Sequence, residues 1–306
     1  MRHVRMLGLC LVAAFALSAV AASSALAVKN PTKSAKIFKN CPVNGEGGGS
    51  PDVSCIFGAT ELGEGGQFTV GPITVPLARQ IVLQYGISQP SEYEFPFIAP
   101  THGAEAITPT PEKVPGEPIA HITSAEQTEL GWPESLSYKY AQAQRKHTVK
   151  TVTETIEGAG NPATHIFNIL TEEGVGVEAP VKIKGENKWL SELGDVCYIG
   201  SEAEPIVQHL TSGPSESPLT HETIHGSHGE VSFAHEGEEV TLTHSNLVDN
   251  TYPVPGAVCT GPYSSVIAAT IDKEFGLPAV AGASVTELKG TLYTGSKHLA
   301  ETKGGA

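Results

Sequence analysis

Apolar and polar residues alternate with a period of two in several short runs of this chain, which is typical of strands with one buried face. The first such positions are Phe68, Val70, Ile73, Val75, Leu77, Ile81, Leu83 and Tyr85. Gly71-Pro72 and Pro76 interrupt this series, and both residue types are typical of turns. The pattern predicts a hairpin or a small meander over residues 68–85.

A longer alternation follows later in the chain. Its apolar positions are Val175, Val177, Ala179, Val181 and Ile183, and the residues between them are Gly176, Glu178, Pro180 and Lys182. Proline has no N–H to donate within a sheet, so Pro180 predicts either an edge strand or two short strands. Two further short strands are expected at Val231–Phe233 and Val240–Leu242, separated by residues 235–238.

One segment has the period of a helix instead. Ile267, Ile271 and Phe275 lie at positions i, i+4 and i+8, which places them on one helical face. Ser264-Ser265 is a candidate N-terminal cap, and Gly276 followed by Pro278 is a stop signal. The pattern predicts one short helix near residues 265–275.

These elements together predict a mainly β protein, built as an antiparallel β-sandwich-like module or modules. Residues 99–118 are rich in proline and poor in core residues, and we interpret them as a connector. We therefore expect an N-terminal β module over 28–98 and a C-terminal β module over 119–306. One large β domain is the alternative.

Residues 1–27 resemble a secretory signal peptide. Arg2 and Arg5 precede an apolar run that ends at Ala22, and Ala25-Leu26-Ala27 has the small-residue pattern of a cleavage site. The alternative, a membrane anchor, needs about 20 apolar residues, which is longer than this run. We expect cleavage after Ala27 and a secreted protein, extracellular or in the cell envelope, without a transmembrane segment in the mature chain.

The net charge is −14, from 33 acidic and 19 basic residues. An acidic surface repels nucleic acid and anionic lipid, so we predict no nucleic-acid partner. The aspartates are scattered singly, whereas calcium loops cluster their oxygen ligands. The acidity is interpreted as a solvated surface rich in glutamate.

Four cysteines remain after the predicted cleavage: Cys41, Cys55, Cys197 and Cys259. An even number in an exported chain favours two disulfides, although four cysteines allow three connectivities. We favour the sequential pairs Cys41–Cys55 and Cys197–Cys259. A zinc site made of all four cysteines is disfavoured because the chain has no C-x-x-C pair.

The segment "HETIHGSHG" spells the zinc-hydrolase motif H-E-x-x-H at His221, Glu222 and His225. The motif binds zinc when a helix sets both imidazoles one turn apart, with the glutamate positioned as the base. Pro214 and Pro218 upstream, and Gly226 directly after the second histidine, oppose such a helix. We predict a polar loop or strand edge without catalytic or metal residues, and keep a zinc-dependent hydrolase, with His228 as a further histidine of the segment, as the alternative.

Other signals for chemistry are weak. The chain has no G-x-S-x-G nucleophile elbow, and no motif indicates a cofactor. Trp132 and Trp189 could stack on sugar rings, which makes a carbohydrate or a cell-envelope component a candidate partner. With only two tryptophans, buried packing is the favoured interpretation for both.

Several segments together, including "CPVNGEGGGSPDVSCIFGAT", "GGQFTVGPITVPL", "NLVDNTYPVPGAVC" and "GLPAVAGASVTELKGTLY", resemble a family of uncharacterised secreted actinobacterial proteins. These segments carry glycine, proline, cysteine and apolar residues rather than reactive groups. The resemblance therefore implies export, disulfides and a shared fold, and it assigns no activity or ligand. From sequence we expect a non-catalytic, exported, β-rich binding module.

Overall fold

The fold was analysed in a computed structural model, which describes residues 37–42, 53–88, 97–101, 103–296 and Leu299. Strand accounts for 41% of this structure and helix for 20%, so the mainly β prediction is confirmed. The predicted signal peptide, residues 1–27, lies outside the described residues.

Sheet A has eight strands in the order β14-β15-β17-β1-β4-β5, with β2 and β3 attached through β17. Its strands are β1 (Val53–Thr60), β2 (Gly66–Val70), β3 (Ile73–Pro76), β4 (Val82–Ser88), β5 (Phe97–Ile98), β14 (Glu230–Ala234), β15 (Glu239–Asp249) and β17 (Thr286–Ser296). The predicted hairpin is present as β2–β3, and β4 pairs with β1 instead of extending a meander. β14 and β15 form the two predicted later strands.

Sheet B has seven strands in the order β16-β10-β9-β7-β6, with β8 and β11 on β9. Its strands are β6 (Thr110–Lys113), β7 (Val152–Gly158), β8 (Ala163–Thr164), β9 (Val177–Asn187), β10 (Val196–Ile199), β11 (Ile206–Leu210) and β16 (Ala257–Thr260). A separate hairpin pairs β12 (Pro214–Glu216) with β13 (Thr223–His225). All of these pairings are antiparallel.

The prediction that Pro180 marks an edge or a break was wrong, because β9 is an unbroken strand with neighbours on both sides. The Pro180 carbonyl accepts from the Ala159 N–H at 2.9 Å, so the proline faces the side of β7. On that side β7 ends at Gly158 and β8 begins at Ala163. The missing proline N–H therefore falls in a gap between two partners and costs no ladder hydrogen bond.

The helix predicted near 265–275 is α7 (Ser264–Phe275), and it buries Ile267, Ile271 and Phe275 as expected. The predicted serine cap is wrong, because Tyr263 occupies the N-cap position and provides no side-chain cap bond. Gly276 ends the helix at φ 62°, a left-handed conformation that glycine adopts without strain.

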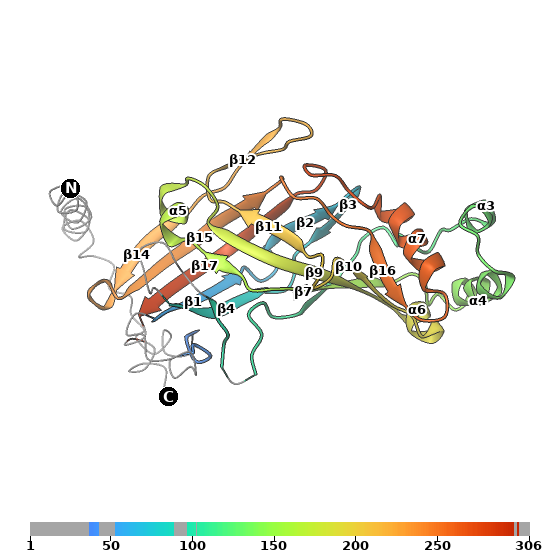
Figure 1. The fold of residues 1–306 in the computed structure, drawn as a ribbon, viewed down its shortest axis with the longest axis horizontal. Coiled ribbons are helices and arrows are strands. Elements are labelled where there is room, and N and C mark those ends of the chain that lie inside the picture. Colours follow the sequence, from blue (N-terminus) through green and yellow to red (C-terminus); the bar gives the residue numbers. More distant parts are fainter. Residues whose placement is uncertain (1–36, 43–52, 89–96, 102, 297–298, 300–306) are drawn as a thin grey trace.

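Four more helices were not predicted: α3 (Ser124–Glu129), α4 (Glu134–Arg145), α5 (Ile166–Thr171) and α6 (Lys188–Leu193). Figure 1 shows α3, α4, α6 and α7 gathered at the end of the molecule away from β14, and β9 and β11 lying across β15 and β17. Tyr140 of α4 and Trp189 of α6 form one buried aromatic cluster with Trp132, which precedes α4.

The 99–118 segment connects the two sheets in chain order. The strands before it belong to sheet A, and the strands that follow it, up to β11, belong to sheet B. The segment contributes β6 to sheet B and buries Ile107 and Val114. The chain later returns to sheet A through β14, β15 and β17, so residues from both predicted modules hydrogen-bond within one sheet.

Candidate functional site

Both predicted disulfide pairs are present. Cys197 and Cys259 face each other in register on β10 and β16, so this bridge ties the edge strand of sheet B to its neighbour. Cys41 and Cys55 are bridged at the start of β1. Cys41 and Cys55 pack with Phe38 and Leu299 in a small hydrophobic cluster of their own. The four cysteines therefore act structurally.

The H-E-x-x-H segment is not helical. His221 has φ 58° and lies between the β12–β13 turn and β13, while His225 is the last residue of β13. His221, Glu222 and His225 are all exposed. The His221 Nδ1 lies 3.3 Å from Glu216 Oε1 across the hairpin. A two-stranded hairpin does not stack positions i and i+4 as a helix does, so the motif lacks the geometry on which its zinc chemistry depends.

The neighbouring histidine, His228, lies apart from this hairpin and pairs with Glu172 at 3.8 Å. Within the part of the chain that the structure describes, no three side chains of His, Cys, Asp or Glu converge as a metal site requires. His221 and His228 therefore pair with different glutamates, Glu216 and Glu172.

Neither tryptophan offers a surface for a sugar. Trp132 and Trp189 are buried, and their rings stack on each other with centroids 5.9 Å apart. The Trp132 indole donates to Thr270 Oγ1 at 3.0 Å, which fixes the ring against α7. The packing interpretation is confirmed for both residues.

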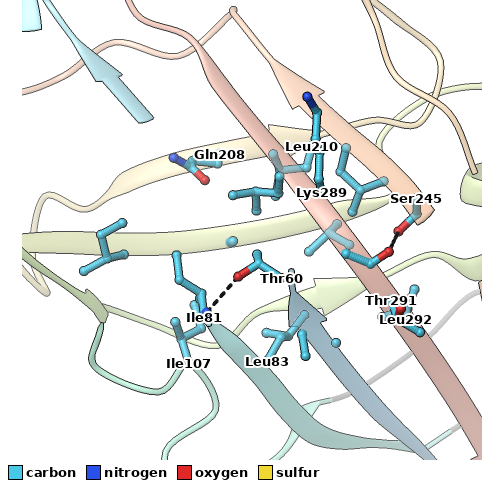
Figure 2. Close-up of a pocket in the computed structure, with 18 of the residues that line it drawn as sticks. Thr60, Ile81, Leu83, Ile107, Gln208, Leu210, Ser245, Lys289, Thr291 and Leu292 are labelled. Atoms are coloured by element: carbon cyan, nitrogen blue, oxygen red, sulfur yellow. Dashed lines mark hydrogen bonds between the residues drawn. The ribbon is translucent and has the colours of Figure 1, made fainter. Parts of the chain in front are cut away.

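The feature best suited to hold an apolar ligand is a cavity between the two sheets, with a volume of about 100 Å³. We name it the intersheet cavity. Strands β1, β2, β4, β15 and β17 of sheet A and strands β7, β9 and β11 of sheet B contribute to its lining (Figure 2). Its aliphatic lining includes Leu83, Ile107, Ala179, Leu210 and Leu292.

The polar groups at the edges of the intersheet cavity are already bonded to the protein. Thr60 Oγ1 accepts from the Ile81 N–H at 2.8 Å, and Ser245 Oγ donates to the Gly290 carbonyl at 3.0 Å (Figure 2). Gln208 Nε2 donates to Thr286 Oγ1 at 2.9 Å. These bonds leave few polar groups free to bind a ligand, so a ligand in the intersheet cavity would contact a mainly apolar lining.

A β-bulge shapes one wall of this cavity. The register of β15 against β17 shifts between Leu242 and Ser245, where β15 holds one residue more than its partner. His244 within the bulge has φ 54°. The β17 residue paired with Ser245 is Gly290, and a glycine is required there because a Cβ would lie 2.2 Å from the Ala59 carbonyl oxygen. The bulge and this close approach place the Ser245 side chain at the cavity edge.

A second cavity, of about 40 Å³, lies on the same inner face of sheet B beside α7. Its lining is apolar except for Glu154 and Tyr198. Glu154 is paired in register with Glu112 on β6, and both side chains are buried. Burial raises the pKa of Glu154 to about 8, and the nearby Glu112 carboxylate adds to the shift. This pair was not predicted from the sequence.

A signal for Glu154 was present in the sequence. In the segment "VTETI", residues 152–156, alternation places Val152, Glu154 and Ile156 on the same face of the strand. Since the two apolar residues face the core, the charged Glu154 also points inward. Glu112 could not be linked to it, because the two residues are far apart in the chain and only the β6–β7 register brings them together.

Comparisons with family models, with curated proteins and with solved structures gave no match for this chain. The resemblance described from sequence therefore remains a prediction. Of the helices that the structure describes, none is sufficiently long and apolar to cross a membrane.

Proposed function

We propose that this chain is an exported binding protein, extracellular or in the cell envelope, that acts by holding a small apolar ligand in the intersheet cavity rather than by catalysis. The observation that carries the proposal is the cavity itself, a space of about 100 Å³ walled by aliphatic side chains from both sheets. Ligand sites are typically concave and mostly apolar.

The lining favours a hydrocarbon over a carbohydrate. A sugar needs partners for its hydroxyl groups, and burying such a group unpaired costs roughly 1–3 kcal/mol. Thr60, Gln208 and Ser245 already have partners within the protein. An apolar cavity of about 150 Å³ stays dry and accepts benzene or xenon, so a somewhat smaller one suits a compact hydrocarbon or the end of an acyl chain.

Export is supported by two independent features. The first is the N-terminal pattern of Arg2 and Arg5, an apolar run and Ala25-Leu26-Ala27. The second is the pair of disulfides, because such bonds persist in oxidising compartments.

Benzene titration tests the ligand class. At ten times its dissociation constant, a ligand of the folded state adds ~1.4 kcal/mol of stability, which corresponds to a rise of roughly 2–4 °C in melting temperature. We expect this rise together with NMR shifts at residues that line the intersheet cavity. Ala179→Leu should abolish both by filling the space, with Val181→Leu as a milder alternative that fills the same space.

Ala203→Leu is the matched control, because Ala203 is exposed outside the cavity and the change adds the same atoms. Equal benzene responses in the cavity variants and in the wild type would refute the proposed site. A wild-type protein that shows no response would also refute it.

A further inference from the structure

One carboxyl oxygen of Glu154, Oε1, is buried without a hydrogen-bond partner in the described part of the chain. Both Glu154 and its cross-strand neighbour Glu112 are 3% exposed. Glu112 accepts from the Arg79 backbone N–H. No described group makes a hydrogen bond with Glu154 Oε1. Buried polar atoms nearly always have a partner, so an unpartnered carboxyl oxygen indicates a group that the protein itself does not supply.

The second cavity gives that group a place to bind. Glu154 is the charged residue of its lining, and the walls include Val152, Ile183 and Phe275. No lysine or arginine is among the residues that line it. A ligand here would contact apolar walls on most sides and a carboxyl on one.

A glycine opposite Glu154 leaves the space open. Gly185 on β9 is the register partner of Glu154. A Cβ built at Gly185 would meet Cys197 O at 3.8 Å and no nearer atom, so a side chain would fit. Glycine inside a strand weakens it and often marks the close approach of a ligand. Here the missing side chain is part of the cavity.

We propose that the second cavity is a binding site for a small alkylammonium group, with the ammonium at Glu154 and the alkyl carbon against the aliphatic walls. A cation satisfies the unpartnered oxygen and also offsets the repulsion between Glu154 and Glu112. A neutral alcohol could bond to the unpartnered oxygen but would not offset the repulsion between the two carboxylates. A volume of about 40 Å³ limits the group to about three heavy atoms, such as methylamine or ethylamine.

Binding should release a proton. Because the pKa of Glu154 is raised to about 8, most molecules carry this proton at pH 7, and an ammonium ion favours the ionised carboxylate instead. Among the other titratable groups, Glu112 is the register partner of Glu154, Tyr198 lines the same cavity, and the charge of Glu154 acts on the Tyr252 phenol. Burial raises the pKa of the Tyr252 phenol, so that tyrosine stays neutral near pH 7. The release therefore comes from the carboxyl pair.

Calorimetric titration with ethylamine at pH 7, in two buffers of different ionisation enthalpy, tests the proposal. Limits on ligand efficiency place a ligand of three heavy atoms at about millimolar affinity, so the titration covers the millimolar range. We expect nearly one proton released per ethylamine bound, and at least tenfold weaker binding of ethanol.

Two variants locate the site. Glu154→Gln keeps the size of the side chain and removes its charge, so ethylamine binding should weaken at least tenfold and release no proton. Gly185→Ala keeps the carboxyl and fills the space, and it should weaken binding to a similar extent. Their controls are Glu157→Gln on the same strand and Gly158→Ala, where a new Cβ has Ile107 Cβ at 3.6 Å.

The proposal is overturned if ethanol binds as well as ethylamine, if Glu154→Gln retains the affinity, or if the wild type shows no saturable binding. It is independent of the intersheet cavity. Ala179→Leu should therefore leave ethylamine binding unchanged, which separates a failure here from a failure of the proposed function.

Discussion

A carboxylate is costly to bury, and Glu154 occupies an inward position in a layer of aliphatic side chains. Its neighbours on the strand face are Val152 and Ile156, and its cross-strand neighbour is a second acid, Glu112. Both burial and like charge favour the protonated form. The folded protein therefore keeps a proton on Glu154 that the unfolded chain would release near pH 4.5.

This difference predicts a pH-dependent stability. Because the folded-state pKa of Glu154 is about 8 against an ordinary 4.5, its contribution is fully present below pH 4.5 and is lost as the pH rises through 8. The change over that interval is up to ~5 kcal/mol. Glu154→Gln stays neutral, so we expect its free energy of unfolding, measured by urea denaturation, to exceed that of wild type increasingly from pH 5 to 8.5. A wild-type curve parallel to that of Glu154→Gln, with Glu157→Gln as control, would contradict the prediction.

At the scale of elements, the disulfide between β10 and β16 secures a four-residue edge strand. β16 (Ala257–Thr260) has β10 as its sheet partner and is followed closely by α7. Without the bridge, the strand would keep only one short hydrogen-bonded ladder. Val258 on β16 is also exposed, so a released strand would present an apolar edge.

Removal of this bridge should destabilise the fold. Cys197 and Cys259 are separated by 62 positions, and the loop-closure model gives ~4 kcal/mol for a loop of this length. The Cys41–Cys55 separation is 14, which gives ~3 kcal/mol. We expect denaturant titration of the two double serine variants to give losses of these sizes. Mass spectrometry of non-reduced peptides should recover both pairs, and free or exchanged thiols would disprove the pairing.

The histidine hairpin should contribute little to stability. His221 and His225 are exposed on the short β12–β13 pair, and exposed substitutions usually change stability within ~0.5 kcal/mol. We therefore expect the double alanine variant of these histidines to melt at nearly the wild-type temperature. Metal analysis after dialysis should find less than one zinc per chain. One retained zinc together with a large loss of stability would restore the hydrolase hypothesis.

At the scale of the whole molecule, the two ends of the described chain meet in sheet A. β17 lies between β15 and β1, and its residues 290–296 pair with residues 54–60. One hydrophobic core then runs through both sheets, with Phe68 from sheet A, Ile183 from sheet B and Ile271 from α7 among its members. This shared core couples the two sheets energetically.

We expect a single cooperative unfolding transition in calorimetry. Unfolding of one sheet would expose the apolar inner face of the other, so both should unfold together. The calorimetric and van't Hoff enthalpies should therefore agree. Two separated transitions would instead support independent modules on either side of residues 99–118.

The proposed export also concerns the whole molecule. We expect the mature protein to begin at Val28 and to accumulate outside the cytoplasmic membrane, because the residues before it have the charge, apolar run and small-residue site of a signal peptide. N-terminal sequencing of the secreted protein is the measurement. Recovery of chains that begin at Met1 from the membrane fraction would contradict it.

The sequence by itself determined features that depend on local spacing. The hairpin β2–β3, the strands β14 and β15 and the helix α7 were predicted, because alternation and a helical period act over short distances. The favoured pairing of the cysteines in chain order also agrees with the structure. α4 was missed because only Leu136, Tyr140 and Ala143 face the core, while Tyr138 is 62% exposed and weakens the period.

Only the tertiary structure decided which distant residues meet. Sheet B tolerates Pro180 because this residue lies opposite the gap between the end of β7 and the start of β8. The sequence of β9 alone does not show where that gap falls. The intersheet cavity requires two sheets to face each other, and the pairing of Glu154 with Glu112 requires the β6–β7 register. Register and packing arise from the free energy of the whole core, so a pattern read along one segment carries no information about its partner.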